Sequence, residues 1–267
     1  MKRHTTATNG HPHLAGWLLL SCILPVAAGQ TVQETPVEDL RIDEDENKHY
    51  FLIGPKAEAK PPADGYRLLV VLPGGDGSAD FHPFVKRIFE NALPDGYILA
   101  QAVAPKWNDD KNRVVWPTRK LRAKKMKFPT EAFIAEIIKE VQGRHTIDAK
   151  HIYLLGWSSG GPACYAIAID RKTPVRGAFV VMSVFKPDLL PPLARAKGKS
   201  FYVLHSPQDF IQMRFPEAAV KKLAEKGAKT KLETYSGGHG WPSDVYGKIR
   251  AGIEWLEQQA AEAKPGG

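Results

Sequence analysis

The sequence predicts an α/β fold in which helices cover both faces of a mostly parallel sheet. Seven short apolar runs with strand-like composition recur along the chain, and segments with helical periodicity separate several of them. Such alternation is typical of parallel sheets. The 267 residues suffice for one sizeable core and are few for two, so we expect a single domain over residues 49–260.

Each expected element has its own local pattern. The strands are expected at residues 50–53, 66–72, 97–103, 152–155, 175–182, 201–205 and 231–235. The clearest helix begins at Thr130, its expected N-cap, because the apolar residues that follow recur at helical spacing on one stripe: Phe133, Ile134, Ile137, Ile138 and Val141. Residues 216–226 and 243–258 predict two further helices, each with a proline or a small residue at its start.

The N-terminus has the layout of a signal peptide over residues 1–28. Lys2 and Arg3 precede an apolar run from residue 14 to residue 28 that ends in small residues. This run is shorter than the roughly 20 residues of a membrane span, so we expect cleavage after Ala28, export to the periplasm or the exterior, and no transmembrane span in the mature chain. Lipid attachment at Cys22 is the alternative, although the residues after it are apolar where a lipoprotein tether is polar.

The sequence predicts a flexible segment at each end of the expected mature chain. Residues 30–48 hold seven acidic side chains and little apolar periodicity, which predicts an acidic flexible leader over 29–48, and residues 261–267 form a short tail. Without residues 1–28 the chain has 35 basic and 29 acidic residues, a mildly basic balance for which no nucleic-acid partner is expected. Only Cys164 then remains, so an internal disulfide is excluded.

A basic segment over 111–127 interrupts the alternation of strands and helices. It contains eight cations around Trp116 and Pro117: Lys111, Arg113, Arg119, Lys120, Arg122, Lys124, Lys125 and Lys127. The segment follows the 97–103 strand and is therefore expected at the carboxyl edge of the sheet, where open α/β folds bind ligands. Two interpretations stay open: a solvated loop, or a basic rim that attracts an acidic substrate, an acidic surface or an anionic polymer.

The run Gly156-Trp157-Ser158-Ser159-Gly160 carries the strongest chemical signal. It lies between an apolar strand and a helix, as a nucleophile elbow requires, and its glycines relieve crowding in a sharp turn that exposes the serine hydroxyl. Ser158 is the expected nucleophile. The alternative is an ordinary glycine-rich turn. Cys164 is interpreted as a small buried residue.

A serine nucleophile needs a base and an acid that orients the base. His239 lies in the run Gly237-Gly238-His239-Gly240 after the last expected strand and is the best placed of the nine histidines. Asp209 follows the 201–205 strand, which gives the order Ser158, Asp209, His239. Asp188, in the loop after the preceding strand, is the main alternative for the acid. Asp244 is interpreted as a helix-start residue.

Attack on an ester carbonyl also requires backbone N–H groups that stabilise the oxyanion. The run Leu72-Pro73-Gly74-Gly75-Asp76-Gly77 ends an early strand and offers one donor, Gly75 in first place and Asp76 in second. Ser159, directly after the nucleophile, supplies the other.

With these motifs, residues 66–256 resemble the α/β-hydrolase superfamily, in its phospholipase/carboxylesterase or dienelactone-hydrolase-like branch. The resemblance rests on LPGGDG at 72–77, LGWSSGG at 155–161, HSPQD at 205–209 and GGHGW at 237–241. It implies hydrolysis of carboxylic esters or thioesters through an acyl-enzyme, with no metal and no organic cofactor. Pro73 departs from the branch, which usually has His-Gly there, and this leaves the first oxyanion donor open.

Aromatic residues near the expected site indicate what kind of ester it accepts. Trp107, Trp116, Trp157 and Trp241 are candidates for binding an acyl chain, a phenolic acid or a sugar, with core packing as the alternative for each. The predicted function is thus an exported carboxylesterase for a small or polymer-attached ester. Rival interpretations are a thioesterase, a peptidase of the same fold, and a non-catalytic protein that binds anionic polymers.

Overall fold

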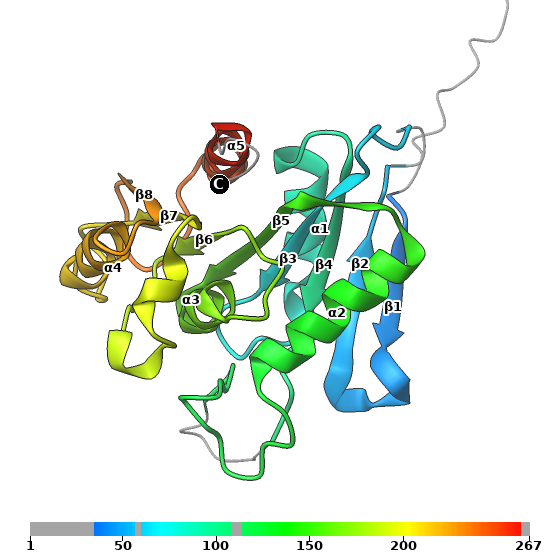
Figure 1. Ribbon diagram of the computed structural model, residues 1–267, viewed down its shortest axis with the longest axis horizontal. Helices are drawn as coiled ribbons and strands as arrows, with labels where there is room; N and C mark the ends of the chain where they lie inside the picture. Colours follow the sequence, from blue (N-terminus) through cyan, green and yellow to red (C-terminus); the bar gives the residue numbers. More distant parts are fainter. Residues whose placement is uncertain (1–34, 57–59, 108–113, 263–267) are drawn as a thin grey trace, which may run out of the picture. The chain divides into compact units, whose positions relative to one another are not determined.

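The computed structural model describes residues 35–56, 60–107 and 114–262, all in one compact unit built on an eight-stranded sheet (Figure 1). The order of the strands is β1-β2-β4-β3-β5-β6-β7-β8. Neighbouring strands from β4 to β8 are parallel, whereas β1 and β2 are antiparallel to their neighbours. The predicted mostly parallel sheet is confirmed.

Every apolar run in the sequence that was expected to form a strand lies on one. The strands are β1 Val37–Arg41, β2 His49–Ile53, β3 Tyr66–Leu72, β4 Tyr97–Ala102, β5 Ile147–Trp157, β6 Gly177–Val181, β7 Ser200–His205 and β8 Lys229–Thr234. The buried parts of the central strands are mostly apolar because helices cover both faces of a parallel sheet. The last residues of β3, β5, β6, β7 and β8 therefore lie along one carboxyl edge.

In the part of the chain that the structure describes, five α-helices form the two outer layers. They are α1 His82–Ala92, α2 Thr130–Arg144, α3 Gly161–Ile169, α4 Arg214–Ala224 and α5 Val245–Glu262. The apolar stripes of α2, α3 and α4 pack into one hydrophobic core, and those of α1 and α5 pack into a second core on the other face. Among the described residues, no helix has the length and apolar character needed to cross a membrane.

The acidic stretch after residue 34 differs from the flexible leader expected over 29–48. Residues 37–41 form β1, which pairs along its whole length with the buried strand β2, and two short 3-10 turns follow it. One of its acidic side chains, Glu38, forms an ion pair with Arg144, which donates to both carboxylate oxygens at 2.7 and 2.6 Å. An edge strand has one solvated side, so charged residues are compatible with it and discourage pairing with other chains.

Smaller differences concern helix ends. Thr130 is the first residue of α2 rather than its N-cap, which is Pro129, and the Thr130 hydroxyl donates to the carbonyl of Pro117 at 2.7 Å. Helix α1 has no counterpart among the sequence expectations, and α5 continues to Glu262, two residues into the expected tail. The predicted signal peptide, Cys22, Lys111 and Arg113 lie outside the described residues.

Candidate active site

Ser158 lies on a tight turn between β5 and α3, at the carboxyl edge of the sheet. Its backbone has φ +48°, in the left-handed region that non-glycine residues seldom adopt. The flanking glycines make this turn possible, since a Cβ at Gly156 would clash with the sulfur of Cys164 and a Cβ at Gly160 would clash with the carbonyl of Leu72. The sequence pattern and the backbone conformation therefore agree.

Ser183, which was not predicted as a site residue, stabilises this turn. Ser183, buried just beyond the end of β6, donates a hydrogen bond of 2.6 Å from its hydroxyl to the backbone carbonyl of Ser158. Its neighbour Met182 has a positive φ of +42°. The only sequence signal for Ser183 was its place after an expected strand.

The structure brings the three predicted triad residues into direct contact. Nε2 of His239 lies 2.9 Å from Oγ of Ser158, and Nδ1 lies 2.9 Å from each carboxylate oxygen of Asp209. Because a carboxylate only accepts hydrogen bonds, this contact fixes the proton of a neutral imidazole on Nδ1 and leaves the Nε2 lone pair facing the hydroxyl. The Asp209 side chain is fully buried, whereas the His239 side chain is 21% exposed.

Two loops that hold Asp209 and His239 are tied to each other. The Ser206 hydroxyl donates to the carbonyl of Gly237, and the Gly237 N–H donates to the side-chain oxygen of Gln208 at 3.3 Å. The Tyr235 hydroxyl donates to the carbonyl of Gly240 at 2.6 Å, and burial together with the charge of Asp209 raises the pKa of Tyr235 to about 12. The first two bonds hold the two loops together, and the third stabilises the loop of His239, so acid and base keep their relative positions.

The alternative residues lie elsewhere. Asp188 is exposed, in a 3-10 turn over Pro187–Leu189, and no hydrogen bond joins it to a histidine among the described residues. His205 is fully buried and its Nε2 lies 2.7 Å from the carbonyl of Ile211. Cys164 is buried behind the elbow, and burial raises the pKa of its thiol, so it is not a reactive thiolate.

The loop after β3 approaches the elbow from the other side. The Ser159 hydroxyl donates to the carbonyl of Gly75 at 2.9 Å, and Gly75 has φ +58°. The indole N–H of Trp116 donates to the carbonyl of Pro73 at 2.9 Å. The backbone carbonyl of Pro73 thus helps to hold this loop in place. This contact does not require the histidine that the related enzyme branch usually has at this position.

A cavity of about 530 Å³ opens at Ser158 and His239. The loop at Gly75, the start of α1, the ends of β5 and β6, and the loop before α5 all contribute to its wall. Four aromatic rings form one connected cluster in that wall, with centroid separations of 5.5 to 5.7 Å: Phe81, Phe84, Trp157 and Trp241. The site is thus a mainly aromatic cleft with a polar centre.

The four predicted tryptophans divide into two groups. Trp157 and Trp241 line the cavity that contains Ser158, and their contact with substrate stays a prediction. Trp116 differs from that expectation, since it is 2% exposed and holds the Pro73 carbonyl. Trp107 also differs, since its ring packs edge-on against Phe128 at 4.8 Å and lines a separate small hollow with Asp76.

Several residues that line the cavity or lie next to it were not anticipated, among them Phe81 and Met182. Phe84 and Arg87 lie on α1, the helix that the sequence analysis did not predict, and Nε of Arg87 donates to the Tyr246 hydroxyl at 3.1 Å. Phe210, next to Asp209, is 76% exposed and its ring centroid lies 4.3 Å from that of His239. The only indication of them in the sequence was their position shortly after the LPGGDG motif, for Phe84 and Arg87, or the HSPQD motif, for Phe210.

Solved structures of several enzymes are similar to this chain over most of its length. No model of a protein family matches the sequence. Similar structures include an esterase of Rhizomucor miehei, at TM-score 0.64 and 15% identity over 86% of each chain. Fluorophosphonate-binding serine hydrolase F of Staphylococcus aureus has TM-score 0.61 and 12% identity, over 85% of this chain and 99% of that one.

A third similar structure is an α/β-hydrolase enzyme from a Medee basin deep-sea metagenome library. It has TM-score 0.62 and 12% identity, over 85% of this chain and 98% of that one. These likenesses extend over most of the chain, and they agree with the strand order and with the resemblance carried by the sequence motifs. The chain therefore has the α/β-hydrolase fold.

Proposed function

We propose that the protein is an exported serine hydrolase that cleaves carboxylic esters through an acyl-enzyme. The observation that carries this proposal is the chain of contacts from Asp209 through His239 to Ser158 at the mouth of an aromatic cavity. Export rests on the signal-peptide layout of residues 1–28. The esterase and the serine hydrolase named among the similar structures are compatible with this chemistry.

In the first half-reaction, Oγ of Ser158 bonds to the ester carbonyl carbon while its proton passes to Nε2 of His239. Asp209, which accepts from Nδ1, stabilises the imidazolium that forms. The tetrahedral intermediate collapses when the carbon–oxygen bond to the alcohol breaks and His239 returns the proton to the leaving oxygen. Water then bonds to the acyl carbon while its proton passes to Nε2 of His239. The bond between that carbon and Oγ of Ser158 breaks, His239 returns the proton to Oγ, and the carboxylic acid leaves.

The oxyanion would lie between the elbow and the loop after β3. The backbone N–H of Ser159 is one proposed donor and the N–H of Gly75 is the other. Gly75 is favoured over Asp76 because Gly75 lines the cavity that contains Ser158, whereas Asp76 lines the neighbouring hollow at Trp107. The Ser159–Gly75 hydrogen bond keeps the two donors at a fixed separation.

A fluorophosphonate probe is expected to label the full chain at Ser158. An activated serine attacks the phosphorus with loss of fluoride, and the labelled peptide is identified by mass spectrometry. Label on another residue, or no label on protein shown to be folded by circular dichroism, would exclude the proposed nucleophile. This experiment separates an enzyme from a binding protein of the same fold.

The cavity wall favours esters that carry an aromatic group. Trp157, Trp241 and Phe84 line the cavity that contains Ser158, and aromatic rings bind flat apolar groups. Trp241→Ala is expected to lower kcat/KM for a p-nitrophenyl benzoate by about tenfold, the equivalent of one lost aromatic contact. Its effect on p-nitrophenyl acetate is expected to be smaller.

The ratio of the two kcat/KM values is the measurement, because a general loss of folded protein lowers both equally. Trp255→Ala is the matched control, since Trp255 of α5 packs on Tyr202 of β7 and does not line the cavity. Its ratio should equal that of the unmodified protein. An unchanged ratio for Trp241→Ala would remove this tryptophan from substrate binding.

A further inference from the structure

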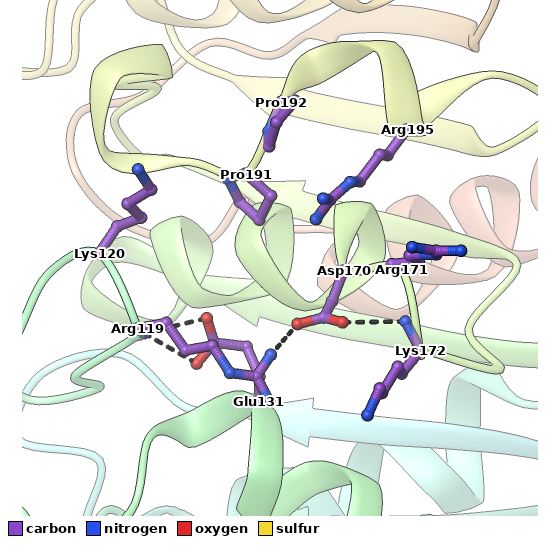
Figure 2. Close-up of a pocket in the computed structure, with 9 residues that line it drawn as sticks. All are labelled: Arg119, Lys120, Glu131, Asp170, Arg171, Lys172, Pro191, Pro192 and Arg195. Atoms are coloured by element: carbon purple, nitrogen blue, oxygen red, sulfur yellow. Dashed lines mark hydrogen bonds and ion pairs between the residues drawn. The ribbon is translucent and has the colours of Figure 1, made fainter.

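A second cavity, also of about 530 Å³, lies on the face of the sheet covered by α2 and α3. Figure 2 shows its wall. Five basic residues line it: Arg119, Lys120, Arg171, Lys172 and Arg195. We call this hollow the basic cleft. Arg119 and Lys120 belong to the basic segment noted in the sequence, whereas the other three come from distant parts of the chain.

Two acidic residues in the wall neutralise only part of this charge. Asp170 forms an ion pair with Arg119. Glu131 is 5% exposed and accepts from the backbone N–H of Arg119 at 3.1 and 3.2 Å, and burial raises the pKa of its carboxyl group. Among the residues that the structure describes, Arg119 alone of the five cations has a carboxylate within ion-pair distance. The cleft therefore keeps a surplus of positive charge.

The five cations come from three segments of the chain. Arg119 and Lys120 precede α2, Arg171 and Lys172 follow α3, and Arg195 lies in a 3-10 helix over Leu193–Ala196. In Figure 2 the side chains of Lys120 and Arg195 lie on opposite sides of Pro191. Like charges around one hollow repel each other, and an anion between them removes this repulsion.

We propose that the basic cleft binds a ligand that carries two or more oxyanion groups, either carboxylates or phosphates. Guanidinium and ammonium groups donate charge-assisted hydrogen bonds to both kinds of oxyanion. The volume lies within the range of small-molecule sites, so the cleft has room for more than one such group. Adjacent prolines at 191 and 192 restrict the backbone on one wall and keep that wall in place without a ligand.

The basic cleft is separate from the cavity at Ser158. Its wall comes from the α2 and α3 side of the sheet, whereas α1 and the loop before α5 form the wall at Ser158. Asp170 and Ser158 lie beyond opposite ends of α3, whose nine residues span roughly 13 Å at 1.5 Å each. The proposal therefore does not depend on ester hydrolysis, and binding can be measured on the Ser158→Ala variant.

The test is titration calorimetry of the full chain at low ionic strength with tricarballylate, tripolyphosphate and acetate. One equivalent of at least one multivalent probe should bind, at least tenfold more tightly than acetate, and the tighter probe identifies carboxylate or phosphate as the preferred group. Added salt should weaken binding because it screens the charges. Absence of binding by both multivalent probes would overturn the proposal.

A charge-matched pair of variants locates the site. The double variant Lys120→Gln/Arg195→Gln should bind the better probe about 100-fold more weakly, roughly tenfold for each charge-assisted hydrogen bond lost. The control Lys222→Gln/Arg214→Gln removes two exposed cations from α4 and should bind like the unmodified chain. If both double variants lost probe affinity equally, the probe would be attracted to the net charge of the protein alone, and the proposal of a binding site in the basic cleft would be overturned.

Discussion

Replacing Ser158 with alanine is expected to lower kcat for a short p-nitrophenyl ester by about 10⁴-fold or more. The loss is large because Oγ forms the bond to the acyl group. The hydroxyl beside it, on Ser159, donates to the Gly75 carbonyl and is not in contact with His239 among the hydrogen bonds of the described residues. The measurement is the rate of p-nitrophenol release.

The thermal midpoint of the Ser158→Ala protein should stay close to that of the unmodified protein. Among the described residues, the Ser158 hydroxyl forms a hydrogen bond only with the partly exposed His239. Ser243→Ala, at an exposed serine before α5, is the matched control and should retain full activity. Undiminished turnover by Ser158→Ala would show that another group is the nucleophile and would remove the main support for the proposed function.

The second large effect is expected for Asp209→Asn, with a loss of about 10³- to 10⁴-fold in kcat. The amide is almost the same size and can still accept from the Ile211 N–H, which lies 2.8 Å from Oδ1. It lacks the negative charge that stabilises the imidazolium, and its NH₂ group favours the wrong tautomer of His239. Folding should therefore be largely retained while turnover falls.

Asp188→Asn is the control because it makes the same chemical change in an exposed turn. Its kcat should be within about twofold of the unmodified value, as expected for a surface substitution with little effect on structure. The reverse result, loss in Asp188→Asn and retention in Asp209→Asn, would transfer the role of acid to Asp188. Measuring both variants in one preparation series makes the comparison direct.

The sheet and the elbow could be predicted because their signals are local. Apolar runs of strand length mark β2 to β8, and the glycines around Ser158 mark a turn that only small residues permit. Strand β1 could not be recognised, because an edge strand obtains its hydrogen bonds from β2 and needs few apolar residues. Helix α1 follows a glycine-rich loop and was overlooked, and with it Phe84 and Arg87.

The choice between like residues needed tertiary contacts. Asp188 and Asp209 both follow strands that end at the same edge, and only the 2.9 Å distances between Asp209 and His239 distinguish them. The sequence places four tryptophans at or after the ends of strands and does not distinguish those that face the site from those that do not. Packing places Trp157 and Trp241 in the cavity wall, Trp116 behind the Pro73 carbonyl and Trp107 against Phe128.

The sequence by itself determined the alternation of strands and helices, the elbow at Ser158 and the order of the motifs that carry Ser158, Asp209 and His239. Each of these motifs consists of residues close together in the chain. Only the tertiary structure decided which carboxylate meets the imidazole, which rings face Ser158, and that Arg195 joins Arg119 and Lys120 around one cleft. These last features depend on the paths of loops. Loop paths follow from many weak contacts between segments far apart in sequence, and no local pattern encodes them.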